Sequence, residues 1–227
     1  MKKILIISAH PDDEVLGCGG TISRLSREGC EVRILILGEG ITSRAGSGRK
    51  VNSETLAELH KQARAVGRSL GAKHVILEKL PDNLFDTVPL LEVAQMIERA
   101  IADFQPESVF TQHGGDLNLD HAITFRATLT AVRPVKGSSV NKLYAYEVPS
   151  STEWAFQQFS QVFKPNFFVD ISPTLDDKIS ALKKYSGEVR EFPHPRSETT
   201  LRANAARWGS TVGFEAAEAF ELIFERL

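Results

Sequence analysis

The chain has 227 residues, of which 27 are basic and 29 acidic, so its formal net charge is -2. This small charge excess disfavours nucleic acid or an anionic membrane surface as the main partner and leaves a small polar molecule as the expected one. No segment approaches the roughly 20 consecutive apolar residues of a membrane span, and the N-terminal run ILII is too short for a signal peptide.

The two cysteines indicate a reducing compartment. Cys18 and Cys30 flank a predicted helix of about 12 residues, which is roughly 18 Å long at 1.5 Å per residue. A disulfide needs Cα atoms less than about 7 Å apart, so we expect reduced thiols and a cytoplasmic protein.

Predicted strands and helices alternate along the chain. Residues 2–9 (KKILIISA) and 31–37 (EVRILIL) are continuous apolar runs, typical of strands that are buried on both faces. Residues 21–29 (TISRLSREG) predict a short helix that ends at Gly29. Further strands are predicted over 74–78, 108–112, 142–148 and 166–171, and further helices over 53–70, 90–103, 120–133 and 174–187. The run AFELIF, residues 219–224, fits a strand or a helix equally well.

This alternation predicts an α/β fold, a Rossmann-like and mostly parallel sheet with helices on both faces. The chain contains no internal repeat and no clear linker, so we expect a single domain over residues 1–227.

Residues 38–53 (GEGITSRAGSGRKVNS) are polar, rich in glycine and serine, and without periodicity. Such a loop in a compact α/β domain is either a mobile loop at the active site or a disordered surface excursion. Arg44 in this loop is a candidate for contacting a phosphate or hydroxyl-rich ligand, although most exposed arginines are only solvated.

Three consecutive carboxylates follow the first predicted strand, in AHPDDE. Ligands of doubly wound folds bind outside the carboxyl ends of the strands, so this position favours a function. His10 and Asp13 lie three residues apart across a turn stiffened by Pro11, so both side chains can converge on one point while Asp12 lies beside it. A divalent cation there would remove the repulsion between the acids. The alternative, an acidic helix start, leaves His10 without a role.

A second polar cluster, QHGGDLNLDH, follows the predicted strand over 108–112. It offers His113, Asp116, Asn118, Asp120 and His121. Two histidines and one carboxylate suit a catalytic zinc ion whose fourth position is left for water. Asp120 could serve as a partner that orients a ligand or as a helix cap.

The glycines in GCGG, residues 17–20, raise the alternative of a dinucleotide-binding oxidoreductase. The neighbouring carboxylates argue against a bound pyrophosphate, and no complete GxGxxG follows the strand. We expect these glycines to allow close packing of the helix against the sheet.

AHPDDE followed by a glycine-rich turn, with DLNLDH later in the chain, resembles the PIG-L/LmbE-like family of zinc-dependent N-deacetylases. The segment over 194–220 also resembles the C-terminal part of sugar-acting members, so the resemblance covers nearly the whole chain. It implies that His10, Asp13 and His121 bind zinc and that Asp12 is the general base.

Many members of the family carry a histidine where this chain has Asn118, three residues before the last ligand. The resemblance therefore leaves the donor to the oxyanion open between Asn118 and His194. Arg196, in the segment HPRS, joins Arg44 as a candidate for contacting the substrate.

The resemblance implies hydrolysis of an N-acetyl group from an N-acetylglucosamine-type sugar or conjugate by zinc-activated water, which releases acetate and a free amine. A glycosylated thiol or another acylated amine is the alternative substrate, and a non-catalytic metal- or sugar-binding protein is the alternative class. A nucleotide-linked or lipid-linked sugar and a homo-oligomer are compatible with this interpretation, and another divalent ion could replace zinc.

Overall fold

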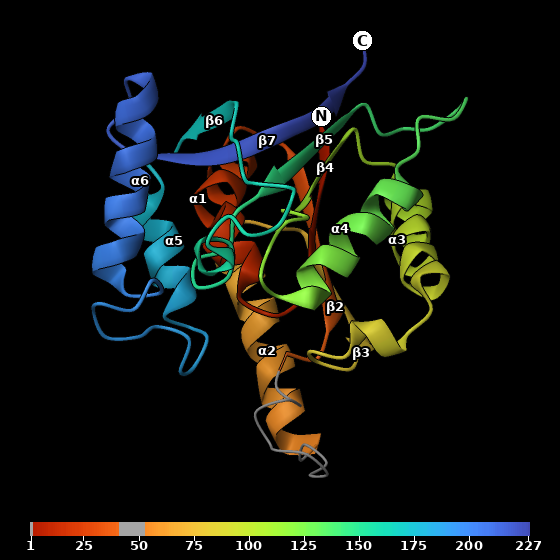
Figure 1. Cartoon of the computed structure of the whole chain (residues 1–227), viewed down its shortest axis with the longest axis horizontal. Coiled ribbons are helices and arrows are strands. Elements are labelled where there is room, and N and C mark those ends of the chain that lie inside the picture. The colour runs from red at the N-terminus through yellow and green to blue at the C-terminus, as the bar shows by residue number, and fades with distance from the viewer. Residues whose placement is uncertain (1, 41–52) are drawn as a thin grey trace.

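Seven strands form one sheet in the order β3-β2-β1-β4-β5-β7-β6 in the computed structural model, which describes residues 2–40 and 53–227 (Figure 1). Strands β1 to β5 pair in parallel, whereas β7 pairs antiparallel with both β5 and β6. The strands are β1 (Lys3–Ser8), β2 (Glu31–Gly38), β3 (His74–Leu80), β4 (Ser108–Gln112), β5 (Lys142–Tyr146), β6 (Phe167–Asp170) and β7 (Ala217–Glu225). The expected α/β fold with a mostly parallel sheet is confirmed.

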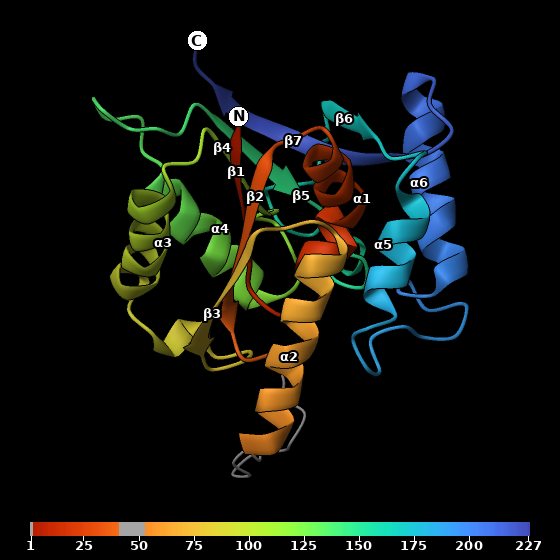
Figure 2. The ribbon, with the colours of Figure 1, turned by 180° about the vertical axis from the view of Figure 1, so that it is seen from behind.

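Helices cover both faces of the sheet, with α3 and α4 on one face and α1, α2, α5 and α6 on the other (Figures 1 and 2). The helices are α1 (Asp13–Arg27), α2 (Ser53–Ser69), α3 (Leu90–Phe104), α4 (Leu119–Ala131), α5 (Leu175–Leu182) and α6 (Glu198–Val212). Alternate residues of β1 serve the two faces, since Ile4 and Ile6 join one apolar cluster and Leu5 and Ile7 the other. Burial on both faces explains why β1 lacks the polar alternation of a half-exposed strand.

Helix α1 begins at Asp13, so the expectation of a short helix starting at Thr21 was wrong. Its glycines lie inside the helix and allow it to approach the sheet closely, as expected. A Cβ atom on Gly17 would lie 2.1 Å from Cδ2 of Tyr146, and one on Gly20 would lie 2.8 Å from Ile171. Only glycine fits such contacts.

The C-terminal third departs most from the predicted elements. The predicted helix over 174–187 ends at Leu182, and the ambiguous run at 219–224 is part of strand β7. Helix α6 was not predicted at all, because its buried positions are Leu201, Ala205 and Gly209. Two of these side chains are small, so they leave a weak hydrophobic pattern.

Cys18 and Cys30 are both free, as predicted. Among the described residues no helix is long and apolar enough to cross a membrane. Residues 41–52, which hold most of the predicted loop and Arg44, lie outside the described part of the chain.

Candidate metal centre and active site

The two predicted polar clusters meet at the carboxyl ends of β1 and β4. These strands pair directly in parallel, so the loops that follow them leave the same edge of the sheet. His10 lies in the loop after β1, and Asp13 is the first residue of α1. His121 lies in the first turn of α4, which Asn118 caps by accepting a hydrogen bond from the Asp120 backbone N–H at 2.9 Å.

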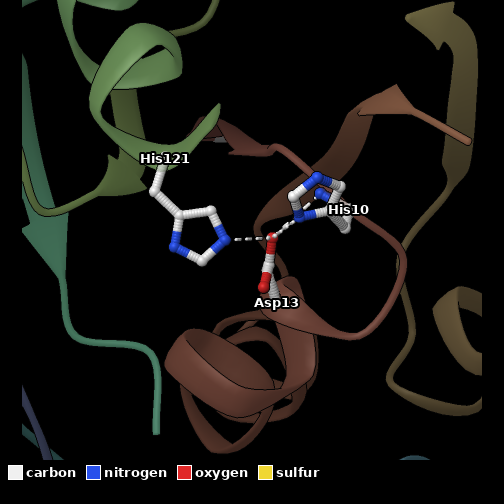
Figure 3. A group of neighbouring side chains, drawn as sticks. All are labelled: His10, Asp13 and His121. Carbon is white, nitrogen blue, oxygen red and sulfur yellow. Dashed lines mark hydrogen bonds and ion pairs between the residues drawn. The ribbon is translucent and has the colours of Figure 1, made fainter. Parts of the chain in front are cut away.

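His10, Asp13 and His121 form a compact group, in which the two imidazole rings flank the Asp13 carboxylate (Figure 3). Asp13 Oδ2 lies 3.6 Å from Nδ1 of His10 and 3.3 Å from Nε2 of His121. Ligands at 2.0–2.1 Å from a tetrahedral zinc ion are about 3.3 Å apart, so the spacing fits such an ion. All three side chains are buried, which is the usual setting of a protein metal site.

A carboxylate contacts the other ring nitrogen of each histidine. Nε2 of His10 lies 2.9 Å from Asp120 Oδ2, and Nδ1 of His121 lies 3.1 Å from Asp116 Oδ2. Carboxylates in this position select the tautomer and fix the orientation of metal-binding imidazoles. His10 Nδ1 and His121 Nε2 are thereby left as the ligand atoms nearest Asp13.

His10, Asp82 and Asp120 form a second group with metal-binding spacing. The oxygens of Asp120 already accept the backbone N–H groups of Asn83 at 2.6 Å and Phe85 at 3.0 Å. The group around Asp13 supplies two imidazoles, which are preferred ligands of zinc, whereas the second group supplies only one, so the group around Asp13 fits a zinc ion better.

The acids of this centre favour positive charge on its histidines. Burial lowers the pKa of His10, but hydrogen bonds to Asp120 and Asp13 outweigh it and raise that pKa to about 9. Burial likewise lowers the pKa of His121, whereas the charges of Asp13 and Asp116 raise it to about 10. A cluster that attracts protons this strongly also suits a divalent cation.

Asp12 lies beside this group and lines the same pocket of about 200 Å³. Its carboxylate Oδ2 accepts a 2.6 Å hydrogen bond from Arg196, whose Nη1 also donates to Glu188 at 2.8 Å. Burial raises the pKa of Asp12, and the ion pair with Arg196 opposes this effect. A carboxylate with a raised pKa is a better proton acceptor near neutral pH than an ordinary aspartate.

Glu14, the third acid of the motif, does not line the pocket, and its side chain is fully buried. Its Oε1 accepts the Tyr185 hydroxyl at 2.6 Å and its Oε2 accepts the Asp12 backbone N–H at 3.0 Å. Asp12 has a φ of 110°, a backbone conformation that is rare outside glycine. Glu14 therefore supports the unusual backbone of Asp12, and its burial raises its own pKa to about 7.

The other predicted residues lie in different positions. Asn118 lines the pocket, and its Nδ2 donates to Asn83 Oδ1 at 3.2 Å. His194 does not line the pocket: its ring packs edge-on against Trp154, with centroids 5.5 Å apart, and its Nδ1 accepts the Arg196 backbone N–H. His113 is not part of the metal group, and its Nδ1 lies 2.8 Å from Glu221 Oε2.

Sequence reasoning missed several residues of the site. They are Asp82, Ser150, Ser151, Tyr185 and Glu188. Asp82 follows β3, so the rule about strand ends that found the other clusters could have found it. Tyr185 and Glu188 come from a segment with no motif that marks them.

Comparisons with known proteins place this geometry in context. The chain is 27% identical over 190 residues to "Uncharacterized deacetylase YaiS" of Escherichia coli, which covers 81% of this chain and 90% of that protein. It is 26% identical over 228 residues to the diacetylchitobiose deacetylase of Thermococcus kodakarensis, which covers 98% of this chain and 84% of the relative. The structure of GalB, the 4-carboxy-2-hydroxymuconate hydratase of Pseudomonas putida KT2440, is similar with a TM-score of 0.78 and 21% sequence identity. The match covers 100% of this chain and 98% of GalB, and at this identity it supports a shared fold only.

The family model described as "PIG-L: GlcNAc-PI de-N-acetylase" matches residues 5–132, which is more than half of the chain and includes both polar clusters. The match, the fold and the His-Asp-His group agree with the resemblance drawn from the sequence. The chain belongs to the PIG-L family.

Proposed function

We propose that this protein is a metal-dependent N-deacetylase, which hydrolyses the N-acetyl group of an amino sugar or sugar conjugate to acetate and a free amine. The observation that carries the proposal is the pocket in which Asp12 lies beside the group of His10, Asp13 and His121 without belonging to it. A site that only bound a metal or a sugar would not need this additional carboxylate. Membership of the PIG-L family supports the same chemistry.

Zinc is the proposed ion, because two imidazoles and one carboxylate are a common ligand set of catalytic zinc sites. An ion held by His10, Asp13 and His121 would polarise an amide carbonyl and lower the pKa of water. Asp12 accepts a proton from the attacking water as the water oxygen bonds to the carbonyl carbon. The proton then goes to the nitrogen as the C–N bond breaks.

Arg196 is proposed to position this base. Its bonds to Asp12 and to Ser150 Oγ, at 2.6 and 2.8 Å, restrict the carboxylate to one orientation. Its Nη2 makes no hydrogen bond with the described residues, so the predicted contact between Arg196 and a substrate oxygen remains part of the proposal.

Asn118 is the favoured donor to the oxyanion. Its amide group lines the pocket, and one N–H is left after the bond to Asn83. His194 would have to leave its contact with Trp154 before it could reach the pocket.

An N-acetylglucosamine-type unit is the proposed substrate, and diacetylchitobiose, named for the Thermococcus relative, is the first compound to test. A glycosylated thiol, another acylated amine, or a nucleotide-linked or lipid-linked sugar is the alternative, because the outer part of the substrate is not defined by the metal group. The fold is shared with a hydratase, so the assignment of hydrolysis depends on the site and the family rather than on the sheet.

The deciding experiment compares acetate release and zinc content in the wild type and in Asp12→Asn. We expect the wild type to release acetate from at least one N-acetylated sugar, and the variant to keep its zinc while hydrolysis falls by about 10²–10⁴-fold. Asp176→Asn, at an exposed side chain, is the matched control and should change neither property. Undiminished hydrolysis in Asp12→Asn would show that Asp12 is not the general base. A wild-type protein that binds no divalent metal would refute the metal-dependent mechanism.

A further inference from the structure

A second cavity, of about 420 Å³, adjoins the segment that follows β5. Ser150 and Ser151 line the catalytic pocket, whereas the next two residues, Thr152 and Glu153, line this second cavity. The two cavities share no lining residue, and the second is about twice as large as the first. It is therefore a separate feature of the molecule, next to the active site.

Aromatic rings form a large part of its wall. Phe163 and Trp208 pack edge-on, with centroids 6.4 Å apart, and Phe156 stands at the cavity with 73% of its surface exposed. Phe156 and Gln157 both have left-handed backbones, with φ of 49° and 58°. A left-handed backbone is unfavourable for residues other than glycine, and such conformations cluster where a ligand binds.

Polar groups of both signs face the same cavity. Glu147 Oε1 accepts the Trp208 indole N–H at 2.6 Å, while its Oε2 has no partner among the described residues. The Arg207 guanidinium lies over the Trp208 ring, 4.5 Å from its centroid, and forms no ion pair within the described part of the chain. An acceptor oxygen and a guanidinium are thus available beside the aromatic rings.

These groups match the two sides of a sugar ring. Its C–H face can stack on an aromatic ring, while its hydroxyls can donate to a carboxylate and accept from a guanidinium. The lining holds two carboxylates, Glu147 and Glu153, and one guanidinium, Arg207. Their opposite charges nearly cancel, so the cavity favours a neutral ligand. We propose that this cavity is a saccharide-binding subsite, separate from the catalytic pocket.

The test uses Trp208 as a local reporter. The chain has two tryptophans, and Trp154→Phe leaves Trp208, which lines the cavity, as the single tryptophan. Titration with glucose, N-acetylglucosamine and diacetylchitobiose should give a saturable change in Trp208 emission for at least one sugar. Glu147→Gln and Phe156→Ala should each weaken binding by about tenfold, the loss expected for one strong contact. Phe159→Ala, an exposed residue of the same loop outside the cavity, should leave it unchanged.

All titrations are made in the Asp12→Asn background, so that no sugar is consumed. The proposal does not depend on deacetylation, because glucose carries no acetamide group. Absence of a saturable response at tens of millimolar of every sugar would overturn it. A response that Glu147→Gln and Phe156→Ala both leave unchanged, or that His121→Ala abolishes, would also overturn it, because the sugar would then bind elsewhere. Since Phe156 is largely exposed, its truncation gives a readable result even if Glu147→Gln impairs folding.

Discussion

Replacement of Asp120 by asparagine should weaken metal binding while the fold is retained. Asp120 Oδ2 accepts hydrogen bonds from His10 Nε2 at 2.9 Å and from the Asn83 backbone N–H at 2.6 Å, and Oδ1 accepts the Phe85 backbone N–H at 3.0 Å. Asparagine offers one acceptor oxygen and one amino group. In either orientation its amino group would face at least one backbone N–H.

The size of the effect follows from these contacts. A buried N–H without an acceptor costs about 1–3 kcal/mol in the free energy of unfolding. Loss of the carboxylate behind His10 should also weaken metal affinity by about 10–100-fold, or roughly 1.4–2.7 kcal/mol. The His10 imidazole remains present, but the negatively charged carboxylate beside its Nε2 is lost. That carboxylate is what makes Nδ1 a strong metal ligand.

Competition for zinc with a chromophoric chelator measures the affinity, and chemical denaturation of the metal-free protein measures the stability. Asp86→Asn, an exposed aspartate close to Phe85 in sequence, is the control and should alter neither quantity. If Asp120→Asn bound zinc as tightly as the wild type, Asp120 would not orient His10, and the ligand role given to Nδ1 would lose its support.

Two further predictions concern protons and buried charge. The pKa values of His10 and His121, about 9 and about 10 without metal, mean that both imidazoles are protonated at pH 7 and must lose those protons to bind an ion. Zinc binding at pH 7 should therefore release about two protons, and the zinc affinity should fall as the pH is lowered. Calorimetry in buffers of different ionisation enthalpy measures the number of protons released. Zinc binding without proton release would contradict these pKa values. Lys178→Met breaks a buried 2.6 Å ion pair with Glu218 and should cost about 3–5 kcal/mol in denaturant unfolding. Lys183→Met, at an exposed ion pair, should cost less than about 1 kcal/mol, and equal losses in the two variants would refute the reasoning.

Much of the fold could be predicted because its signals are local. The apolar runs that form β1 and β2 and the turn at Gly29 mark their elements within a few neighbouring residues. Helix α6 could not be found in this way, because it packs through small side chains such as Ala205. The start of α1 was misplaced because the glycines over residues 17–20 were interpreted as a turn that precedes the helix. The close packing expected of these glycines is nevertheless found, since Gly17 lets Tyr146 approach.

The same distinction applies to the site. From the residues alone, the sequence indicated two polar clusters at strand ends, and the family resemblance implied His10, Asp13 and His121 as the metal group with Asp12 as a separate base. The tertiary structure shows that β1 and β4 are neighbours, which brings the two clusters together. Only the tertiary structure brings Arg196 to Asp12, since nothing local links a C-terminal arginine to a residue 184 positions earlier.

Glu14 gives the clearest contrast between the two levels. As the third acid of AHPDDE it reads as a helix-start residue, and the sequence contains no sign of its partner. The structure pairs it with Tyr185, 171 positions away, and with the backbone of Asp12. Residue types and spacing along one loop determine which groups can do chemistry, but contacts between distant segments decide which conformation those groups hold, because burial and hydrogen bonding depend on the whole packed chain.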